Sequence, residues 1–175
     1  MHHFVRVSPF SLYSLLLFTF LCTMTQTLKD ALQKAASFCA YQERTQQEVR
    51  NRLKEWSVWG DDAEEVIAEL ITQNYLNEGR FAKSFAGGKF RVKGWGKRKI
   101  QQHLKQRGIS GYNLEQAMRE IAPDDYRQTL TDLLDKKRRT LRDDNPLVVK
   151  QKLIRYAMSR GYESDLIFAV LGADD

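Results

Sequence analysis

The part of the sequence best suited to a chemical role is a run of basic residues in the middle of the chain. Residues 80–107 contain ten lysines and arginines and no aspartate or glutamate. These are Arg80, Lys83, Lys89, Arg91, Lys93, Lys97, Arg98, Lys99, Lys105 and Arg107. Such a run attracts polyanions, so it predicts a surface that binds nucleic acid or an acidic protein. The alternative is a solvated helix face, which most runs of charge are.

Two features within this basic segment (residues 80–107) refine the prediction. Trp95 stands between two glycines, and it could stack on a base, anchor a protein interface, or pack into the core. Lys97, Arg98 and Lys99 open a predicted helix, where cations oppose the helix dipole. A bound phosphate or carboxylate would reverse that effect, because free amides and cations would then act together. This favours an anion site at the start of that helix.

The remaining composition argues against catalysis and metal chemistry. The chain has 175 residues, a net charge of +6, two cysteines and three histidines. The cysteines are Cys22 and Cys39, and His103 has no Cys or carboxylate at the spacing of a metal ligand. No phosphate-binding loop and no set of nucleophile, base and orienting group is present. We therefore expect neither an enzyme nor a cofactor or metal site.

The elements that must position the basic segment are predicted to be helices. Apolar residues recur at spacings of three and four from residue 28 onwards, and no stretch alternates as a strand does. Thr45 and Glu48 form the pattern of a capping box, and Asp61 could cap the next helix with its side chain. Asn145 and Pro146 match an N-cap followed by proline at the first helical position.

An internal repeat organises these helices into three units. Leu53, Leu104 and Ala157 fall into one column, at spacings of 51 and 53 residues. In all three copies, apolar residues also stand four residues before this column, five residues after it and thirteen residues after it, and the alignment needs no gaps. At the turn column stand Ser57, Gly108 and Gly161, so the first copy has serine where the others have glycine. The pattern predicts an all-α fold of three tandem three-helix units, similar to helix-turn-helix motifs, in an elongated, curved array.

The predicted boundaries place the repeats at residues 28–76, 77–122 and 124–172, after an apolar leader at residues 1–27. Residues 10–22 are too short for a membrane span and have a poor signal-cleavage site. Met24 opens directly onto the first helix, which favours it as the biological start. A genuine signal sequence or anchor remains the alternative. With Met24 as the start, we expect a cytoplasmic protein with no membrane association.

Several short motifs, in this order, resemble the RecX family. They are Tyr75-Leu76-Asn77-Glu78 with Arg80-Phe81-Ala82, then Gly94-x-Gly96-Lys97-x-Lys99-Ile100, then Leu104-x-x-x-Gly108-Ile109, and finally Leu153-x-x-x-Ala157-x-x-x-Gly161-Tyr162. The resemblance covers roughly residues 28–172. The chain departs from the pattern at Ser57, at Trp95, and at Gly87-Gly88, which we expect to interrupt the first helix of the second repeat.

The resemblance implies a regulator of the bacterial recombinase RecA. A family member would lie along the RecA–DNA filament and mostly inhibit its growth, strand exchange and SOS co-protease activity. Partners would be the RecA filament and, weakly and in a salt-dependent way, single- or double-stranded DNA, with the regulator itself a monomer. The contact surface would be Trp95 and the ten basic residues.

Two other classes of function remain open. A helix-turn-helix regulator would read bases directly, and Asn113, Glu115, Gln116 and Arg119 are its best recognition residues. A helical array could also bind only proteins. The steepness of salt dependence separates DNA contact from protein-only binding.

Overall fold

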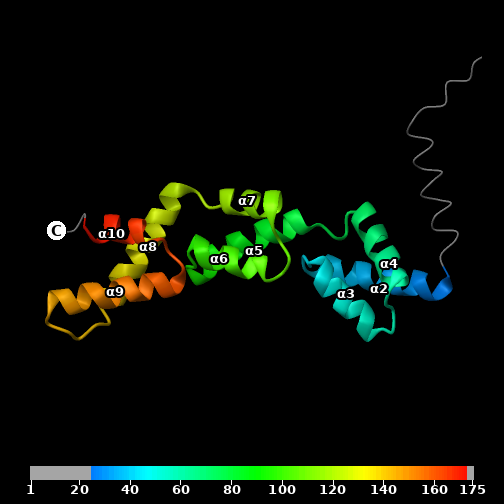
Figure 1. Ribbon diagram of the computed structural model, residues 1–175, viewed down its shortest axis with the longest axis horizontal. Coiled ribbons are helices and arrows are strands. Elements are labelled where there is room, and N and C mark those ends of the chain that lie inside the picture. Colours follow the sequence, from blue (N-terminus) through cyan, green and yellow to red (C-terminus); the bar gives the residue numbers. More distant parts are fainter. Residues whose placement is uncertain (1–24, 173–175) are drawn as a thin grey trace, which may run out of the picture. The chain divides into compact units, whose positions relative to one another are not determined.

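The structure of the protein is a computed structural model that describes residues 25–172. These residues form helices and no strand, which confirms the prediction of an all-α chain. The helices fall into three successive sets of three along the chain (Figure 1). They are α2 (Gln26–Tyr41), α3 (Gln46–Glu55) and α4 (Asp61–Thr72), then α5 (Glu78–Lys93), α6 (Lys97–Lys105) and α7 (Gly111–Arg119), then α8 (Pro123–Arg138), α9 (Pro146–Arg160) and α10 (Ser164–Leu171). The leader at residues 1–24 and its proposed start at Met24 lie outside the described residues.

The chain forms two compact units whose boundary falls inside α3. The first unit contains α2, the chain from Val49 to the end of α3, and α4. The second contains the segment Gln42–Glu48 and everything from Leu76 onwards. The connection before α3 and the first turn of α3 therefore pack with the second and third repeats.

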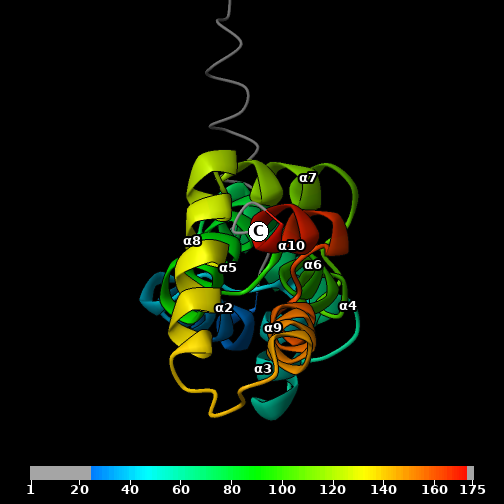
Figure 2. The ribbon, with the colours of Figure 1, turned by 90° about the vertical axis from the view of Figure 1, so that its left-hand side faces the viewer.

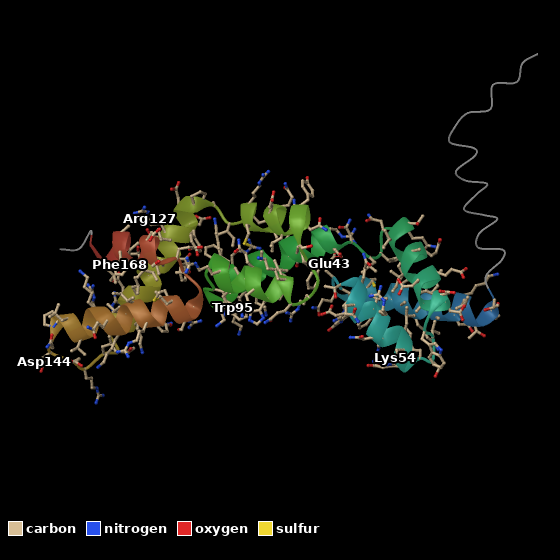
Figure 3. All side chains as sticks on the ribbon, viewed as in Figure 1. Glu43, Lys54, Trp95, Arg127, Asp144 and Phe168 are labelled. Atoms are coloured by element: carbon tan, nitrogen blue, oxygen red, sulfur yellow. The ribbon has the colours of Figure 1, made fainter. Side chains whose placement is uncertain are left out.

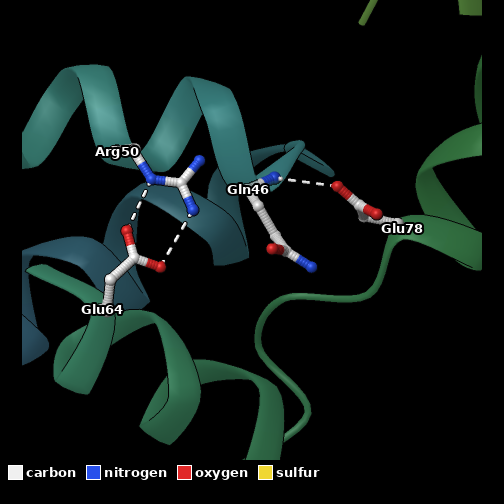
Figure 4. Close-up of polar contacts among 4 residues, drawn as sticks. All are labelled: Gln46, Arg50, Glu64 and Glu78. Atoms are coloured by element: carbon white, nitrogen blue, oxygen red, sulfur yellow. Dashed lines mark hydrogen bonds and ion pairs between the residues drawn. The ribbon is translucent and has the colours of Figure 1, made fainter. Parts of the chain in front are cut away.

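The first unit is held by an apolar stripe from each helix. Val49, Leu53, Val66 and Leu70 are completely buried, and α2 packs against α4. On its surface Arg50 forms a forked ion pair with Glu64, with nitrogen–oxygen distances of 2.6 and 3.0 Å (Figure 4). The arginine lowers the pKa of the Glu64 carboxyl, mainly through the side-chain hydrogen bond.

The second unit has one continuous core shared by repeats two and three. α5 packs closely against α7, while α8, α9 and α10 pack against one another (Figure 1, Figure 2). The core joins both sets of helices through residues such as Ile100, Leu104, Leu130 and Leu153, all fully buried.

The predicted repeat columns coincide with buried positions. Leu53, Leu104 and Ala157 are all inaccessible to solvent. At the turn column, Ser57, Gly108 and Gly161 all have positive φ angles, of 63°, 82° and 92°. The serine therefore keeps the left-handed turn that glycine makes in the other two copies, at a conformational cost that glycine does not bear.

The predicted helix starts are confirmed in two of three cases. The Thr45 hydroxyl accepts from the Glu48 N–H at 3.1 Å, and the Glu48 carboxylate accepts from the Thr45 N–H at 3.2 Å. The Asn145 side chain accepts from the Leu147 N–H at 3.0 Å, directly before α9. Asp61 was expected to cap α4, and this is wrong. Gly60 occupies the N-cap position, so no side chain caps this helix. Asp61 lies in the first turn, where its negative charge interacts favourably with the helix dipole.

The expected interruption at Gly87-Gly88 is also wrong. α5 continues through both glycines to Lys93. Gly87 is buried, and a Cβ placed on it would lie 2.5 Å from the guanidinium of Arg91, one helical turn later. The absence of a side chain at Gly87 thus leaves room for the Arg91 side chain. The helix tolerates both glycines because its tertiary packing outweighs their low helix propensity.

Candidate polyanion-binding surface

The basic segment lies entirely in the second unit, on α5, the connection to α6, and α6 itself. Two of its ten cations are neutralised by acids from elsewhere in that unit. Arg80 pairs with Glu43 at 2.8 Å, and Lys83 pairs with Glu120 at 3.1 Å. The Asn77 side chain caps α5 beside them by accepting from the Arg80 N–H at 3.0 Å. The start of α5 is therefore less positive than its sequence alone indicates.

The other eight cations of the segment form no ion pair with a carboxylate of residues 25–172. They are Lys89, Arg91, Lys93, Lys97, Arg98, Lys99, Lys105 and Arg107. Exposed among them are Arg91, Lys93, Arg98 and Lys105. The unpaired charge thus concentrates on the second half of α5 and along α6.

Trp95 is the centre of a cluster of basic groups. Its side chain is half-buried and packs against the core of the second unit. The ammonium groups of Lys89 and Lys99 lie 5.3 and 4.9 Å from its ring, and the His103 ring lies 4.7 Å away, centroid to centroid. Figure 3 places Trp95 where α5 and α6 meet, among nitrogen-tipped side chains. Trp95 therefore packs inward, as one of its predicted roles requires, and also carries cations on its ring.

Phe85 extends the same cluster along α5. Lys89 and Arg107 lie over its ring at 5.2 and 5.0 Å. Lys89 therefore touches both aromatic rings. Each cation–π contact stabilises a solvent-exposed pair by about 0.5–1 kcal/mol, which offsets part of the repulsion among these like charges. We refer to Phe85, Lys89, Trp95, Lys99, His103 and Arg107 as the aromatic–cation cluster.

Sequence reasoning missed two members of this cluster, Phe85 and His103. The spacing of His103 from other potential ligands excluded it as a metal ligand and indicated no other role. In the described residues no three His, Cys, Asp or Glu side chains gather as a metal site would require. The signal that would have found His103 is the four-residue spacing of Lys99, His103 and Arg107, which puts three basic groups on one side of α6 and of the turn that follows it.

The predicted anion site on the amides at the start of α6 is wrong in one part. The Lys97 N–H already donates to the Tyr126 hydroxyl at 2.8 Å, and the Arg98 N–H donates to the Gly161 carbonyl at 3.1 Å. The Tyr126 hydroxyl in turn donates to Glu163 at 2.8 Å. These amides are therefore satisfied by the third repeat and do not await an anion.

The side chains of the same triplet also differ from one another. The Lys97 ammonium lies 5.0 Å from the Tyr126 ring centre, and the Lys99 ammonium donates to the Ser159 carbonyl at 3.2 Å. Arg98 is exposed. Lys97 and Lys99 therefore help to hold the third repeat.

A close backbone contact explains the glycines that flank this region. Gly96 and Gly161 approach so closely that a Cβ on Gly96 would lie 2.2 Å from the Gly161 carbonyl carbon. The Gly96 N–H donates to the Arg160 carbonyl at 2.8 Å across this contact. These glycines therefore join repeats two and three, and so fix α6 and its cations on the core.

One of the residues that would read bases in a helix-turn-helix regulator, Asn113, is poorly placed for that task. α7 carries all four of these residues and packs against α5. A Cβ on Gly79, in the first turn of α5, would lie 3.3 Å from the Asn113 side-chain oxygen. Asn113 thus faces a neighbouring helix, which does not favour direct recognition of bases by α7.

No helix in the described part of the chain is long and apolar enough to cross a membrane.

Comparisons with known proteins agree with one another. Family models match at residues 31–70, 77–118 and 124–171, described as the first, second and third three-helix domains of RecX. The protein named Regulatory protein RecX from Prosthecochloris aestuarii is 32% identical over 139 residues, covering 79% of this chain and 89% of that protein. Its namesake from Bacillus mycoides is 25% identical over 142 residues, covering 81% of this chain but only 53% of its own length.

Two solved structures share the fold. The crystal structure of RecX from Lactobacillus salivarius has a TM-score of 0.78 at 20% identity, covering 86% of this chain and 97% of its own. A crystal structure titled regulatory protein RecX has a TM-score of 0.76 at 21% identity, covering 85% and 74%. The three-helix repeats predicted from the sequence are thereby confirmed as the fold of this chain.

Proposed function

Because the chain belongs to the RecX family of regulatory proteins, we propose that it binds the RecA–DNA filament and inhibits filament growth, strand exchange and SOS co-protease activity. In this proposal it acts in the cytoplasm as a monomer and as a binding protein without catalysis. The elongated, curved array predicted from the repeats belongs to the same proposal, because such a body suits a filament.

The observation that carries the proposal is the unpaired charge of the second unit. Eight cations from Lys89 to Arg107 have no carboxylate partner in residues 25–172, and a filament offers DNA phosphates or acidic protein walls to neutralise them. Lys and Arg contacts to phosphates give binding that weakens steeply with salt. Arg91, Lys93, Arg98 and Lys105 would make the outer contacts because they are exposed, and the aromatic–cation cluster would form the inner part of the surface.

The experiment is co-sedimentation with RecA assembled on single-stranded DNA, compared with free RecA and bare DNA. The test variant is Arg98→Glu with Lys105→Glu, because both side chains are exposed and neither side chain forms a hydrogen bond or cation–π contact with the third repeat. The matched control is Lys136→Glu with Arg139→Glu, which changes the same number of exposed charges at the end of α8. Circular dichroism checks that both remain folded.

The test variant should bind the filament at least tenfold more weakly, equivalent to about 1.4 kcal/mol. Its binding should also become less dependent on salt, because the logarithmic slope falls by about 0.7 for each phosphate of single-stranded DNA that is no longer neutralised. The control should bind distinctly better than the test variant. Wild-type affinity in a folded test variant would refute the basic segment as the contact surface, and no sedimentation of the wild type would refute the filament as partner.

A further inference from the structure

The aromatic–cation cluster holds an imidazole among permanent positive charges. His103 faces Lys89 from α5, Lys99 from its own helix, Arg107 from the turn after that helix, and the Trp95 ring from the α5–α6 connection. No carboxylate of residues 25–172 contributes to its electrostatic environment. The neutral form of His103 is therefore favoured while the site is empty, because a fourth charge would add to the repulsion.

The same geometry lowers the pKa of His103 below its usual value of 6.5. Partial burial is the largest cause, and the charges of Arg107, Lys99 and Lys89 add to it. A bound anion would act in the opposite direction, since it would neutralise those cations and attract the proton.

A shallow hollow beside the cluster indicates which anion fits. It has a volume of about 260 Å³ and shares Phe85 and Lys89 with the cluster. Phe81 and Val92 give it apolar walls, and Val92 is 77% exposed. A nucleotide joins a flat base to its phosphate, so it could place the phosphate at the cations and the base against these apolar walls.

The geometry points to a proton-coupled phosphate site at His103, where a phosphodiester of single-stranded nucleic acid binds as the imidazole takes up a proton from solvent. The charged imidazole then donates to the phosphate alongside Lys89, Lys99 and Arg107, and a base lies in the hollow against the exposed Val92. This inference rests on the proposed function in one respect, because it takes the basic segment as the surface that meets DNA.

Proton uptake makes the affinity depend on pH with a definite sign. Binding raises the pKa of His103, so affinity is higher at low pH and falls as pH rises through the window between the free and bound values. Each unit by which binding raises the pKa corresponds to a tenfold change in affinity across that window. We expect about three- to tenfold tighter binding at pH 6 than at pH 8.

The experiment measures the affinity of the full chain for a labelled twenty-residue oligothymidylate, without RecA, by fluorescence anisotropy from pH 5.5 to 8 at constant ionic strength. All proteins carry His2→Gln and His3→Gln, so His103 is the only histidine that titrates. The α-amino group is common to all, so its contribution cancels. Two variants are compared with this background: His103→Gln, which stays neutral, and His103→Lys, which stays charged.

The background protein should show the rise in affinity at low pH, and His103→Gln should lose that dependence on pH. His103→Lys should bind at pH 8 about as tightly as the background binds at pH 6. The NMR titration of His103 should move to higher pH when oligothymidylate is added. Unchanged pH dependence in His103→Gln would overturn the inference.

Two other results would also overturn it without touching the RecA proposal. One is no binding of oligothymidylate at any pH, and the other is equally strong pH-dependent binding of a twenty-residue polyglutamate, which would assign the site to an acidic protein. Filament binding is measured separately by sedimentation, so the two proposals can fail independently.

Discussion

Replacing Gly96 by alanine should separate repeats two and three. The backbone of Gly96 has φ −74°, which alanine adopts readily, so any effect is steric. The new Cβ would lie 2.2 Å from both the carbon and the oxygen of the Gly161 carbonyl. Those are backbone atoms, which cannot turn aside as a side chain can. Ordinary contact begins at 3.4 Å, so the two turns must move apart by more than about 1 Å.

Three hydrogen bonds cross this contact and would lengthen with it. They run from the amides of Gly96, Lys97 and Arg98 at 2.8, 2.8 and 3.1 Å. Each contributes about 0.5–1.5 kcal/mol net, and overpacking a core costs about 1–3 kcal/mol. We therefore expect Gly96→Ala to lower the free energy of unfolding by about 3–5 kcal/mol.

The assay is urea denaturation followed by circular dichroism and tryptophan fluorescence. Gly88→Ala is the matched control in the same repeat, because a Cβ there meets no atom within 4 Å. This control should gain about 0.5–1 kcal/mol, as alanine does in a helix interior. If Gly96→Ala unfolds at the urea concentration of the wild type while Gly88→Ala gains stability, the close contact does not hold the repeats together and the reasoning fails.

Two smaller predictions concern the first unit. Ser57→Gly should raise the free energy of unfolding by about 0.5–1 kcal/mol, since φ is 63° there; a decrease in thermal or urea melts would contradict a strained left-handed serine. Glu64→Gln should cost less than about 1 kcal/mol at pH 7, because the pair with Arg50 is exposed. The pKa of Glu64 is lowered in the folded state, so its contribution is present above the usual value and disappears as pH falls. The urea midpoints of wild type and variant should therefore converge as pH falls below the lowered pKa of Glu64, and an unchanged difference would contradict the ion pair.

The fold was predictable because apolar spacing and burial obey the same periodicity. The column of Leu53, Leu104 and Ala157 required only the sequence, and every member is buried. Ser57 departs from the repeat in residue type, yet its backbone follows the pattern. Neighbouring helices impose this conformation, and no local preference of serine encodes it.

The candidate site was less predictable because the ion pairs and hydrogen bonds of its basic residues are formed with residues that are distant in the sequence. Arg80 and Lys83 pair with Glu43 and Glu120, which come from other elements and are distant from them in the sequence. The amide of Lys97 is satisfied by Tyr126, 29 residues later. Helical periodicity predicts which residues share a face of one helix, but it does not predict which faces of different helices pack against each other.

The boundary inside α3 also has a consequence for dissecting the protein. The first repeat ends near residue 76, so a fragment designed to contain only the second and third repeats would begin there. Such a fragment omits Gln42–Glu48, which belongs to the second unit. It would lack the Glu43 carboxylate that pairs with Arg80 and the Gln46 amide that donates to Glu78 at 3.3 Å (Figure 4). A truncation that begins at Gln42 keeps both, because the second unit reaches back beyond the repeat boundary to the connection before α3 and the first turn of α3.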